Sequence, residues 1–385
     1  MKINLITSSR ADFSLLKNLI FEIKKSKNLK LNLTATGSHF SKILGNSYKE
    51  ILENKIKIDY KIKILNNVLS SNNILRDMAK ISNKFATILS KSKPDLLIIL
   101  GDRHEILYAA LAAYISKIPI AHIHGGEITE GSLDNGYRHA ITKISSLHFT
   151  AHQSYKKRLI QLGEQPKSIF NVGGLGAENV KKTKLLNKLE LEKIFKLKFK
   201  KNIITVCVQP EITKDKTEKV IKEILKAIKY EKNKTLIITM PGADKFNHII
   251  IHEIKKFVKK NKNAYLFSSL GGTNFLSYLK NSDAIIGNSS SGILEMPSFK
   301  QATINVGDRQ KGRLKAKSII QVDANYRLIK KAIKKIYSKK FKLICAKSSN
   351  VFEKKSPSKK ITSILKKIKI QNFKVKKFYD LKNVN

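Results

Sequence analysis

The chain has 385 residues, of which 42% are hydrophobic, and a formal net charge of +47 from 76 Lys and Arg against 29 Asp and Glu. This length exceeds the size at which one hydrophobic core usually stops growing, so we expect two domains. The lysines are spread along the whole chain, without a basic arm or a stripe interleaved with aromatic residues. That pattern favours a solvated coat over a nucleic-acid-binding surface, although the positive field would still speed capture of an anionic nucleotide.

The cysteine content and the lengths of the apolar runs indicate the cellular compartment and whether the chain enters a membrane. Cys207 and Cys345 are too few and too distant for a disulfide framework or a thiolate zinc site, which favours a reducing cytoplasm. Residues 1–6 resemble a first strand more than a secretory signal. No apolar run approaches the ~20 residues needed to cross a bilayer, so we expect a cytoplasmic protein without membrane insertion.

Short apolar runs alternate with longer amphipathic segments in the first half of the chain. The runs predict buried strands at residues 2–7, 31–36, 96–100, 118–123, 147–150 and 169–172, with mostly helical patterns between them. This rhythm is typical of a doubly wound α/β domain.

The same rhythm restarts after a lysine-rich connection at residues 181–200. It predicts strands at residues 203–208, 236–240, 264–267, 284–286 and 302–306, followed by amphipathic helices at 329–336 and 361–368. We therefore expect an N-terminal Rossmann-like domain at 1–176, a C-terminal Rossmann-like domain at 177–355, and a helix and tail at 356–385 that pack back on the first domain. The predicted fold class is α/β, with two doubly wound domains facing a central cleft where ligands bind.

Polar residues follow the predicted strands of the first domain. Asp102 comes directly after an apolar strand and would point into the crevice, or alternatively would cap the next helix. Arg10, just before the helical run at 13–23, could help the helix amides to hold a phosphate, while capping is an equal alternative. His39, after the second strand, is open to the same two interpretations, ligand binding or helix capping.

Residues 122–139 contain the densest group of acids, bases and glycines. Gly125 and Gly126 let the backbone approach a ligand, with His124 and Glu127 beside them. Asp134 and Arg138 are four residues apart and share a face if a helix starts there. A metal site on His122, His124 and Glu127 is a weaker alternative, because Glu127 lies beyond two glycines.

The second domain contains a serine-rich segment between a strand and a predicted helix from Ile293. Amides and hydroxyls at residues 287–292 could bind a pyrophosphate, and the nearby Glu295 carboxylate could accept hydrogen bonds from ribose hydroxyls. Arg313 could neutralise a leaving phosphate. The alternative is an ordinary serine-rich cap.

Seven ordered motifs together resemble one enzyme family. They are Ser8 to Asp12, Thr36-Gly37-Ser38-His39, Gly101-Asp102-Arg103, His124-Gly125-Gly126-Glu127, Arg138 to Lys143, Gly287 to Gly292, and Gly307 to Arg313. The chain resembles, over about residues 1–315, the hydrolysing UDP-N-acetylglucosamine 2-epimerases of bacterial sialic-acid synthesis.

The resemblance implies a glycosyltransferase-B-like pair of domains and a specific reaction. UDP is eliminated to give a 2-acetamidoglucal, and water then adds to give N-acetylmannosamine. Neither a metal nor a redox cofactor is implied, the partner is a UDP-linked sugar rather than nucleic acid, and a homodimer or tetramer is compatible with the family.

The resemblance also assigns roles to residues. Asp102 and Asp134 correspond to catalytic acid/base positions, and His124 or Glu127 would serve where many relatives have Glu at the His124 position. The expected substrate-binding residues are Arg10, His39, Arg103, Arg138, His139, Gln209, Asn288, Ser289, Ser290, Ser291, Gly292, Glu295 and Arg313. Gln209-Pro210 replaces a family His-Pro pair, and the segment before Arg138 has fewer acids than in many relatives.

These departures keep other functions open. The first alternative is the same reaction on a nucleotide-linked 2,4-diacetamido-2,4,6-trideoxyhexose for legionaminic-acid synthesis. Less favoured are a non-hydrolysing UDP-N-acetylglucosamine 2-epimerase and a basic nucleic-acid-binding protein, which would rest on charge alone.

Overall fold

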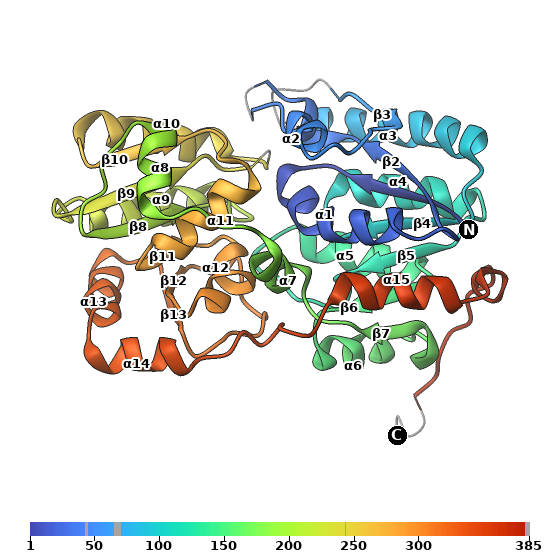
Figure 1. Ribbon diagram of the computed structural model, residues 1–385. Helices are drawn as coiled ribbons and strands as arrows, with labels where there is room; N and C mark the ends of the chain where they lie inside the picture. The colour runs from blue at the N-terminus through green and yellow to red at the C-terminus, as the bar shows by residue number, and fades with distance from the viewer. Residues whose placement is uncertain (43–44, 65–70, 243, 382–385) are drawn as a thin grey trace. The chain divides into compact units, whose positions relative to one another are not determined.

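The computed structural model describes residues 1–42, 45–64, 71–242 and 244–381. The chain divides into two compact units (Figure 1). Unit 1 comprises residues 1–127, 133–179 and 354–385, and unit 2 comprises residues 128–132 and 180–353.

Unit 1 contains a parallel sheet with the strand order β3-β2-β1-β4-β5-β6-β7. Its strands are β1 (Lys2–Thr7), β2 (Lys30–Ala35), β3 (Tyr60–Lys61), β4 (Leu96–Leu100), β5 (Ile120–Ile123), β6 (Leu147–Thr150) and β7 (Ile169–Asn171). All five residues of β4 are buried, as expected for a central parallel strand covered by helices on both faces.

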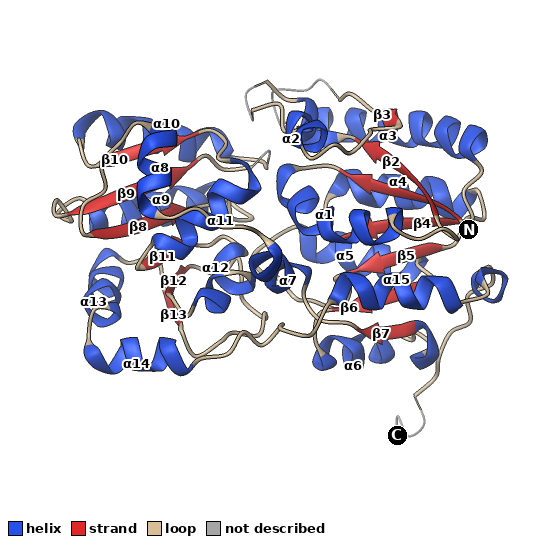
Figure 2. Cartoon of the chain, in the orientation of Figure 1, coloured by secondary structure: helices blue, strands red, loops and turns tan. Residues whose placement is uncertain are grey.

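The helices of unit 1 alternate with these strands (Figure 2). They are α1 (Arg10–Lys24), η1 (Gly37–Phe40), α2 (Tyr48–Glu53), α3 (Ser71–Ser92), α4 (His104–Ile115), α5 (Asp134–Ile144), α6 (Gln153–Gln161), η2 (Pro166–Ser168), the first part of α7 (Leu175–Lys182), α15 (Pro357–Lys367) and η4 (Ile370–Phe373). Helix α15 lies against α1, and its Ile361 and Leu365 join the core formed by β1 and α1. The C-terminal part of the chain therefore completes the core of unit 1.

Unit 2 repeats the doubly wound pattern, with the strand order β10-β9-β8-β11-β12-β13. Its strands are β8 (Asn202–Cys207), β9 (Lys234–Thr239), β10 (Ala264–Phe267), β11 (Ala284–Gly287), β12 (Ala302–Val306) and β13 (Ile319–Val322). Its helices include α8 (Lys188–Phe195), α9 (Lys214–Ile228), α10 (Asn247–Lys260), α11 (Gly271–Asn281), α12 (Ser291–Leu294), η3 (Met296–Phe299), α13 (Tyr326–Ile336) and α14 (Lys339–Lys347).

The predicted α/β class with two doubly wound sheets is confirmed. All eleven strands expected from apolar runs overlap strands of the structure, with ends that differ by at most two residues. The structure adds β3 and β13, and the helix expected from Ile293 is only the short α12, since Pro297 lies within the η3 turn that follows.

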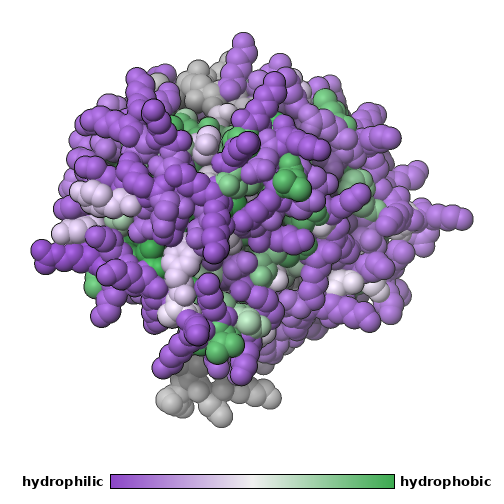
Figure 3. Space-filling view, turned by 60° about the vertical axis from the view of Figure 1, so that its left-hand side comes forward, coloured by the Kyte–Doolittle hydropathy of each residue, from purple (hydrophilic) through white to green (hydrophobic). Residues whose placement is uncertain are grey.

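The surface is dominated by hydrophilic side chains, with only scattered apolar ones on the face that Figure 3 shows. In α13, for example, Ile329, Ile333 and Ile336 are buried while Lys331 and Lys334 are exposed. Among the described residues, no helix is both long enough and apolar enough to span a bilayer.

Candidate active site

The topology of each unit defines where a ligand is expected. The strand order reverses between β1 and β4 in unit 1, and between β8 and β11 in unit 2. Ligands of open parallel sheets lie outside the carboxyl ends of strands at such switch points. These ends are followed by Ser8 and Asp102 in unit 1, and by Gln209 and Asn288 in unit 2.

Arg138 is the central cation of the site in unit 1. Its side chain, on α5, is only 1% exposed, and its Nη2 forms an ion pair with Asp102 Oδ2. Its Nη1 donates a 3.0 Å hydrogen bond to the main-chain oxygen of Glu127. Helix α5 begins at Asp134, so Asp134 and Arg138 share a face as expected. Arg138 also pairs with Asp102, so one buried guanidinium joins the loop after β4 to the loop after β5.

His122 supports the backbone next to Asp102. The imidazole is fully buried on β5, with Nε2 2.8 Å from the Gly101 oxygen and Nδ1 3.2 Å from the Thr142 hydroxyl. A carbonyl oxygen can only accept, so Nε2 carries the proton and Nδ1 accepts from Thr142. Burial lowers the pKa of His122 to about 3, which makes the ring neutral. Both nitrogens are therefore engaged, which counts against the alternative role of His122 as a metal ligand.

The loop after β5 has a constrained backbone. His124 has φ +68°, and Gly126 has φ +80° with its Cβ position only 2.6 Å from the Tyr155 main-chain oxygen. Left-handed backbone at a non-glycine residue is uncommon and clusters at functional sites. Arg158, on α6, donates a 2.5 Å hydrogen bond to the Gly126 oxygen. Arg158 is not predictable from the sequence, because a single cation on a helix gives no signal of this contact.

His124 and Glu127 form a buried pair within this loop. His124 Nδ1 lies 3.3 Å from Glu127 Oε1, and Glu127 is fully buried. The Leu175 amide donates to His124 Nε2 at 3.5 Å, so Nδ1 carries the proton and faces the carboxylate. The structure thus places an imidazole and a carboxylate side by side near Arg138.

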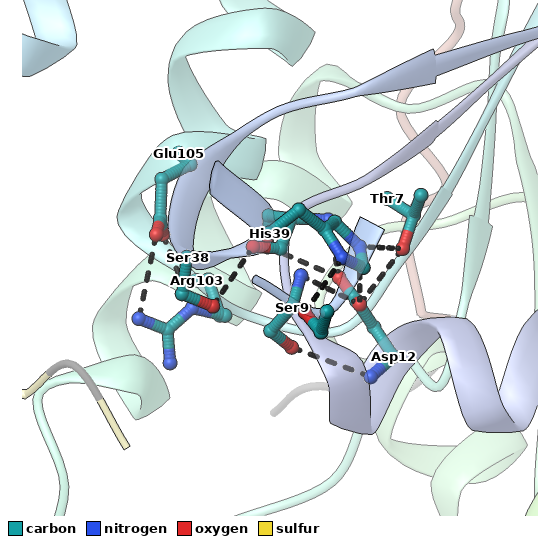
Figure 4. A network of polar contacts seen from close by, with 9 residues as sticks. Thr7, Ser9, Asp12, Ser38, His39, Arg103 and Glu105 are labelled. Carbon is teal, nitrogen blue, oxygen red and sulfur yellow. Dashed lines mark hydrogen bonds and ion pairs between the residues drawn. The ribbon is translucent and has the colours of Figure 1, made fainter. Parts of the chain in front are cut away.

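A second network surrounds the start of α1 (Figure 4). The amides of Ser8 and Ser9 donate to the Asp12 carboxylate at 2.7 and 2.8 Å, and Ser9 caps the helix in return. Asp12 therefore takes up two of the amides that could otherwise hold a phosphate, which supports the capping alternative. Arg10 is the first residue of α1.

His39 belongs to the same network and is fully buried. Its Nε2 lies 3.0 Å from the Thr7 hydroxyl, and its Nδ1 lies 2.9 Å from the Ser47 hydroxyl. Burial lowers the pKa of His39, although the Asp12 and Glu105 charges oppose this. Because protein groups engage both nitrogens, His39 orders the segment after β2.

Arg103 is paired within unit 1 as well. Its Nε lies 3.1 Å from Glu105 Oε2, and the two residues are seen together in Figure 4. Burial opposes ionisation of Glu105, but the Arg103 and His104 charges outweigh it and lower its pKa. Gly37 packs against the same group of residues. It has φ +61°, and a Cβ atom there would lie 2.4 Å from the Ser8 oxygen and 3.1 Å from Glu105 Oε1, so a side chain would not fit. Glu105 was not among the predicted site residues, although it lies only two residues after the Gly101-Asp102-Arg103 motif.

The remaining predicted residues of unit 1 lie on α5. Asp134 is its first residue and is half-buried. His139 follows Arg138 and is half-buried. Burial is the main cause that lowers its pKa, and the Arg138 and Arg158 charges lower it further. Helix α5 therefore carries three of the predicted side chains.

In unit 2, Asn288 ties together the loops after β8 and β11. It is fully buried, accepts from the Gln209 amide at 2.7 Å, and donates to the Gln209 oxygen at 2.9 Å and to Glu211 Oε1 at 3.1 Å. Gln209 Oε1 also accepts from the Gly242 amide at 2.8 Å, which adds the loop after β9. Gln310 donates to the Asn288 oxygen at 2.9 Å. Glu211 and Gln310 were missed by sequence analysis, because their partners are distant in the chain.

Glu295 and Arg313 are the ionisable pair of the serine-rich site. Burial raises the pKa of Glu295 to about 7, although the Ser291 hydroxyl and the Arg313 charge favour the ionised form. Arg313 Nη1 donates to Gln310 Oε1 at 2.9 Å, which links it to Asn288. Ser289 Oγ accepts from the Ser291 amide at 3.3 Å.

The other two predicted residues complete this segment. Ser290 is half-buried at the start of α12. Gly292 packs so closely that a Cβ would lie 2.7 Å from Thr303 Cγ2. Unit 2 thus gathers polar groups from the ends of four parallel strands, a suitable setting for a nucleotide.

Sequence comparisons connect this geometry with known enzymes. Across 99% of both chains, the sequence is 40% identical to the GDP/UDP-N,N'-diacetylbacillosamine 2-epimerase (hydrolyzing) of Campylobacter jejuni subsp. jejuni. It is 38% identical to polysialic acid biosynthesis protein P7 of Escherichia coli, over 99% of this chain and 97% of that protein.

Comparison with solved structures agrees on the fold. The structure of UDP-GlcNAc 2-epimerase from Neisseria meningitidis bound to UDP-GlcNAc superposes with a TM-score of 0.81 and 18% identity, covering 96% of this chain and 100% of that one. The model of the UDP-N-acetylglucosamine 2-epimerase family matches residues 21–366. A match of that extent, together with relatives of about 40% identity along the whole chain, shows that the chain belongs to the UDP-N-acetylglucosamine 2-epimerase family.

Proposed function

We propose that this enzyme hydrolyses UDP-N-acetylglucosamine with inversion at C2, giving N-acetylmannosamine and UDP. The observation that carries the proposal is the Asp102 carboxylate, which follows β4 at the switch point and is fixed by the buried Arg138. Family membership and relatives that are named as hydrolysing 2-epimerases support the reaction type.

The first step is an elimination. A carboxylate removes the C2 proton, the C1–C2 double bond forms, and the C1–O bond to the diphosphate breaks with its electron pair leaving on UDP. The C–H bond is weakly acidic, so the base must be positioned and the departing charge must meet preorganised cations. We assign the acid/base work to Asp102, Asp134 and the His124–Glu127 pair, which unit 1 provides.

The second step is a hydration. A water molecule adds its hydroxyl to C1 of the 2-acetamidoglucal, and a proton is delivered to the opposite face of C2. His124, with its Nδ1 3.3 Å from Glu127 Oε1, is suited to exchange protons in this step. The atoms balance as one sugar nucleotide plus water giving one free amino sugar plus UDP.

Unit 2 would bind the nucleotide. In this proposal Glu295 accepts hydrogen bonds from ribose hydroxyls, the serines at 289–291 contact the diphosphate, and Arg313 neutralises its charge. Gln209 and Asn288 keep the supporting loops in register, so their contribution is mainly to position these groups.

A second substrate is favoured by one comparison. The relative of 40% identity is named for N,N'-diacetylbacillosamine linked to GDP or UDP, a 2,4-diacetamido-2,4,6-trideoxyhexose. The same chemistry at C1 and C2 would apply to that sugar, since the groups at C4 and C6 do not take part in the bond changes.

The decisive experiment is turnover in deuterated water followed by NMR. UDP-N-acetylglucosamine and UDP- or GDP-linked N,N'-diacetylbacillosamine are compared at equal concentration. We expect free nucleoside diphosphate and a 2-epimerised sugar that carries deuterium at C2. Product without deuterium would reject the elimination, and a 2-epimer still linked to UDP would reject hydrolysis.

Asp102→Asn tests the assignment of the catalytic carboxylate. We expect kcat to fall at least about 100-fold, because the amide cannot act as a general base, while UDP affinity stays within about twofold. Asp215→Asn, at an exposed position on α9, is the matched control. If Asp102→Asn loses UDP affinity and folding in parallel with activity, the residue is structural and the assignment is wrong.

A further inference from the structure

The C-terminal segment that follows α15 and η4 is anchored by Lys376, whose side chain is half-buried. Its Nζ lies 2.9 Å from the Thr142 oxygen, 2.8 Å from the Ser145 oxygen and 2.6 Å from Glu164 Oε2. The Lys376 side chain is 22% exposed, and burial lowers the pKa of its ammonium group although Glu164 opposes this. Thr142 and Ser145 are at the end of α5, so this cation occupies the C-terminus of the helix that carries Arg138.

Neighbouring contacts fix the anchor in place. The Tyr379 amide donates to the Gly163 oxygen at 2.9 Å, and Gln165 Nε2 donates to the Phe378 oxygen at 2.9 Å. Gly163 has φ +83°, and a Cβ there would lie 2.3 Å from the Phe378 ring. The segment therefore has a defined register against the end of α6, which decides where Lys376 lies.

Glu164 connects the anchor to the sheet. Its side chain is 2% exposed, with Oε2 2.9 Å from His148 Nε2 and Oε1 3.1 Å from Lys143 Nζ. His148 lies on β6 in register with His122 on β5. The Lys376 ammonium thus balances a buried carboxylate next to the strands beneath the site.

Thr142 connects Lys376 to the backbone next to Asp102 through hydrogen bonds. Its main-chain oxygen accepts from Lys376, and its hydroxyl donates to His122 Nδ1. His122 Nε2 in turn donates to the oxygen of Gly101, the residue before Asp102. The Thr142 oxygen also accepts from the Ser145 amide at 3.1 Å, so Lys376 adds a second donor to it. A cation at this position also meets the negative end of the helix dipole.

We propose that Lys376 is a positioning residue for the Asp102–Arg138 pair, acting through the C-terminus of α5 and the chain Thr142–His122–Gly101. It touches no reacting atom. Loss of the ammonium removes the one group that joins the Thr142 and Ser145 oxygens to Glu164, although the Thr142 oxygen keeps the Ser145 amide and Glu164 keeps His148 and Lys143. The last turn of α5 then loosens, and the Asp102 carboxylate loses its fixed position. The kinetic part of this inference rests on the proposed function.

The test compares Lys376→Met, Lys376→Arg and Lys377→Met. Lys377 is the exposed neighbour and serves as the control. We expect Lys376→Met to lower kcat about 10- to 100-fold, since small displacements of a catalytic group are costly, with UDP affinity within about twofold. Lys376→Arg should restore at least part of kcat, and Lys377→Met should match the wild type. A folded Lys376→Met enzyme with wild-type kcat overturns the proposal.

A structural readout separates this inference from the proposed function. The ring N–H resonance of His122 and hydrogen exchange of the amides at 141–145 are measured in the same variants. Lys376→Met should shift the former and speed the latter, whereas Lys377→Met should change neither. If the wild type turns over no sugar nucleotide while these shifts occur, the proposed function fails and the anchor stands; if neither changes, the anchor fails whatever the activity.

Discussion

At the scale of single residues, Glu295 links burial to pH dependence. Burial raises the pKa of this carboxyl from 4.5 to about 7, so the folded state holds the proton more tightly than the unfolded chain does. Its favourable contribution to stability is therefore present below about pH 4.5 and is lost as the pH rises through 7. We expect Glu295→Gln, relative to the wild type, to gain up to about 3 kcal/mol in unfolding free energy between pH 4.5 and pH 8.

Urea denaturation of the free enzyme at both pH values measures this difference. Glu53→Gln is the matched control, because Glu53 is exposed at the end of α2. Its stability should follow the wild type at both pH values. A Glu295→Gln variant whose offset from the wild type is the same at pH 4.5 and pH 8 would show that Glu295 titrates normally.

The sequence identified residues better than their partners. Asp102 and Arg138 were both recognised from their motifs, yet the spacing of four residues suggested Asp134 as the neighbour of Arg138 on a helix. Helix α5 does begin at Asp134, so these two residues share a face as expected. The additional pairing of Arg138 with Asp102 joins α5 to the end of β4, a contact that depends on how the helix lies against the sheet. Likewise, the sequence does not predict that the Asp12 carboxylate, at the start of α1, accepts hydrogen bonds from the Ser8 and Ser9 amides that could otherwise bind a phosphate.

At the scale of elements, two glycines occupy equivalent positions in the two sheets. Gly101 follows β4 and has φ +81°, with nothing within 4 Å of a Cβ position. Gly287 ends β11 and has φ +143°, with a Cβ position only 2.0 Å from the Cys207 oxygen on β8. Both need glycine for backbone reasons, but only Gly287 needs it for space between strands.

Alanine substitutions separate these two causes. We expect Gly101→Ala to cost about 1–2 kcal/mol of unfolding free energy from backbone strain. Gly287→Ala should cost about 3 kcal/mol or more, because β8 and β11 must also move apart. Chemical denaturation measures both, and equal costs would contradict the steric argument.

Element prediction succeeded where burial is strong. The central strands are almost wholly buried segments of four to six residues rich in aliphatic side chains, and the sequence predicts each of them to within two residues of its ends. The two-residue β3 at a sheet edge is too short to produce a periodic signal. Strand β13 is short and only partly buried, and the exposed Gln321 interrupts its apolar residues, so its sequence signal is weak.

At the scale of the whole molecule, the net charge of +47 acts as a long-range field. Figure 3 shows hydrophilic side chains spread over that face rather than confined to one stripe. Such a field raises the local concentration of an anionic substrate and is screened by salt. We expect kcat/KM for the UDP-sugar to fall about 3- to 10-fold between 20 and 300 mM NaCl, with kcat nearly constant.

Steady-state kinetics across that salt range test the expectation. Potassium glutamate replaces NaCl in a parallel series to separate screening from specific chloride binding. A kcat/KM that does not change with ionic strength would show that the positive surface charge does not help to capture the substrate. Oligonucleotide binding that competes with UDP would instead favour the nucleic-acid alternative.

The chain passes from one unit to the other at residues 127–128, 132–133, 179–180 and 353–354. A chimera made with a single crossover point in the gene therefore cannot take one whole unit from each of two parent proteins. A chimera that exchanges the nucleotide-binding half for that of a relative needs several coordinated junctions, including a five-residue insert at 128–132. Homologous recombination would then more readily transmit this enzyme as an undivided whole than as interchangeable modules.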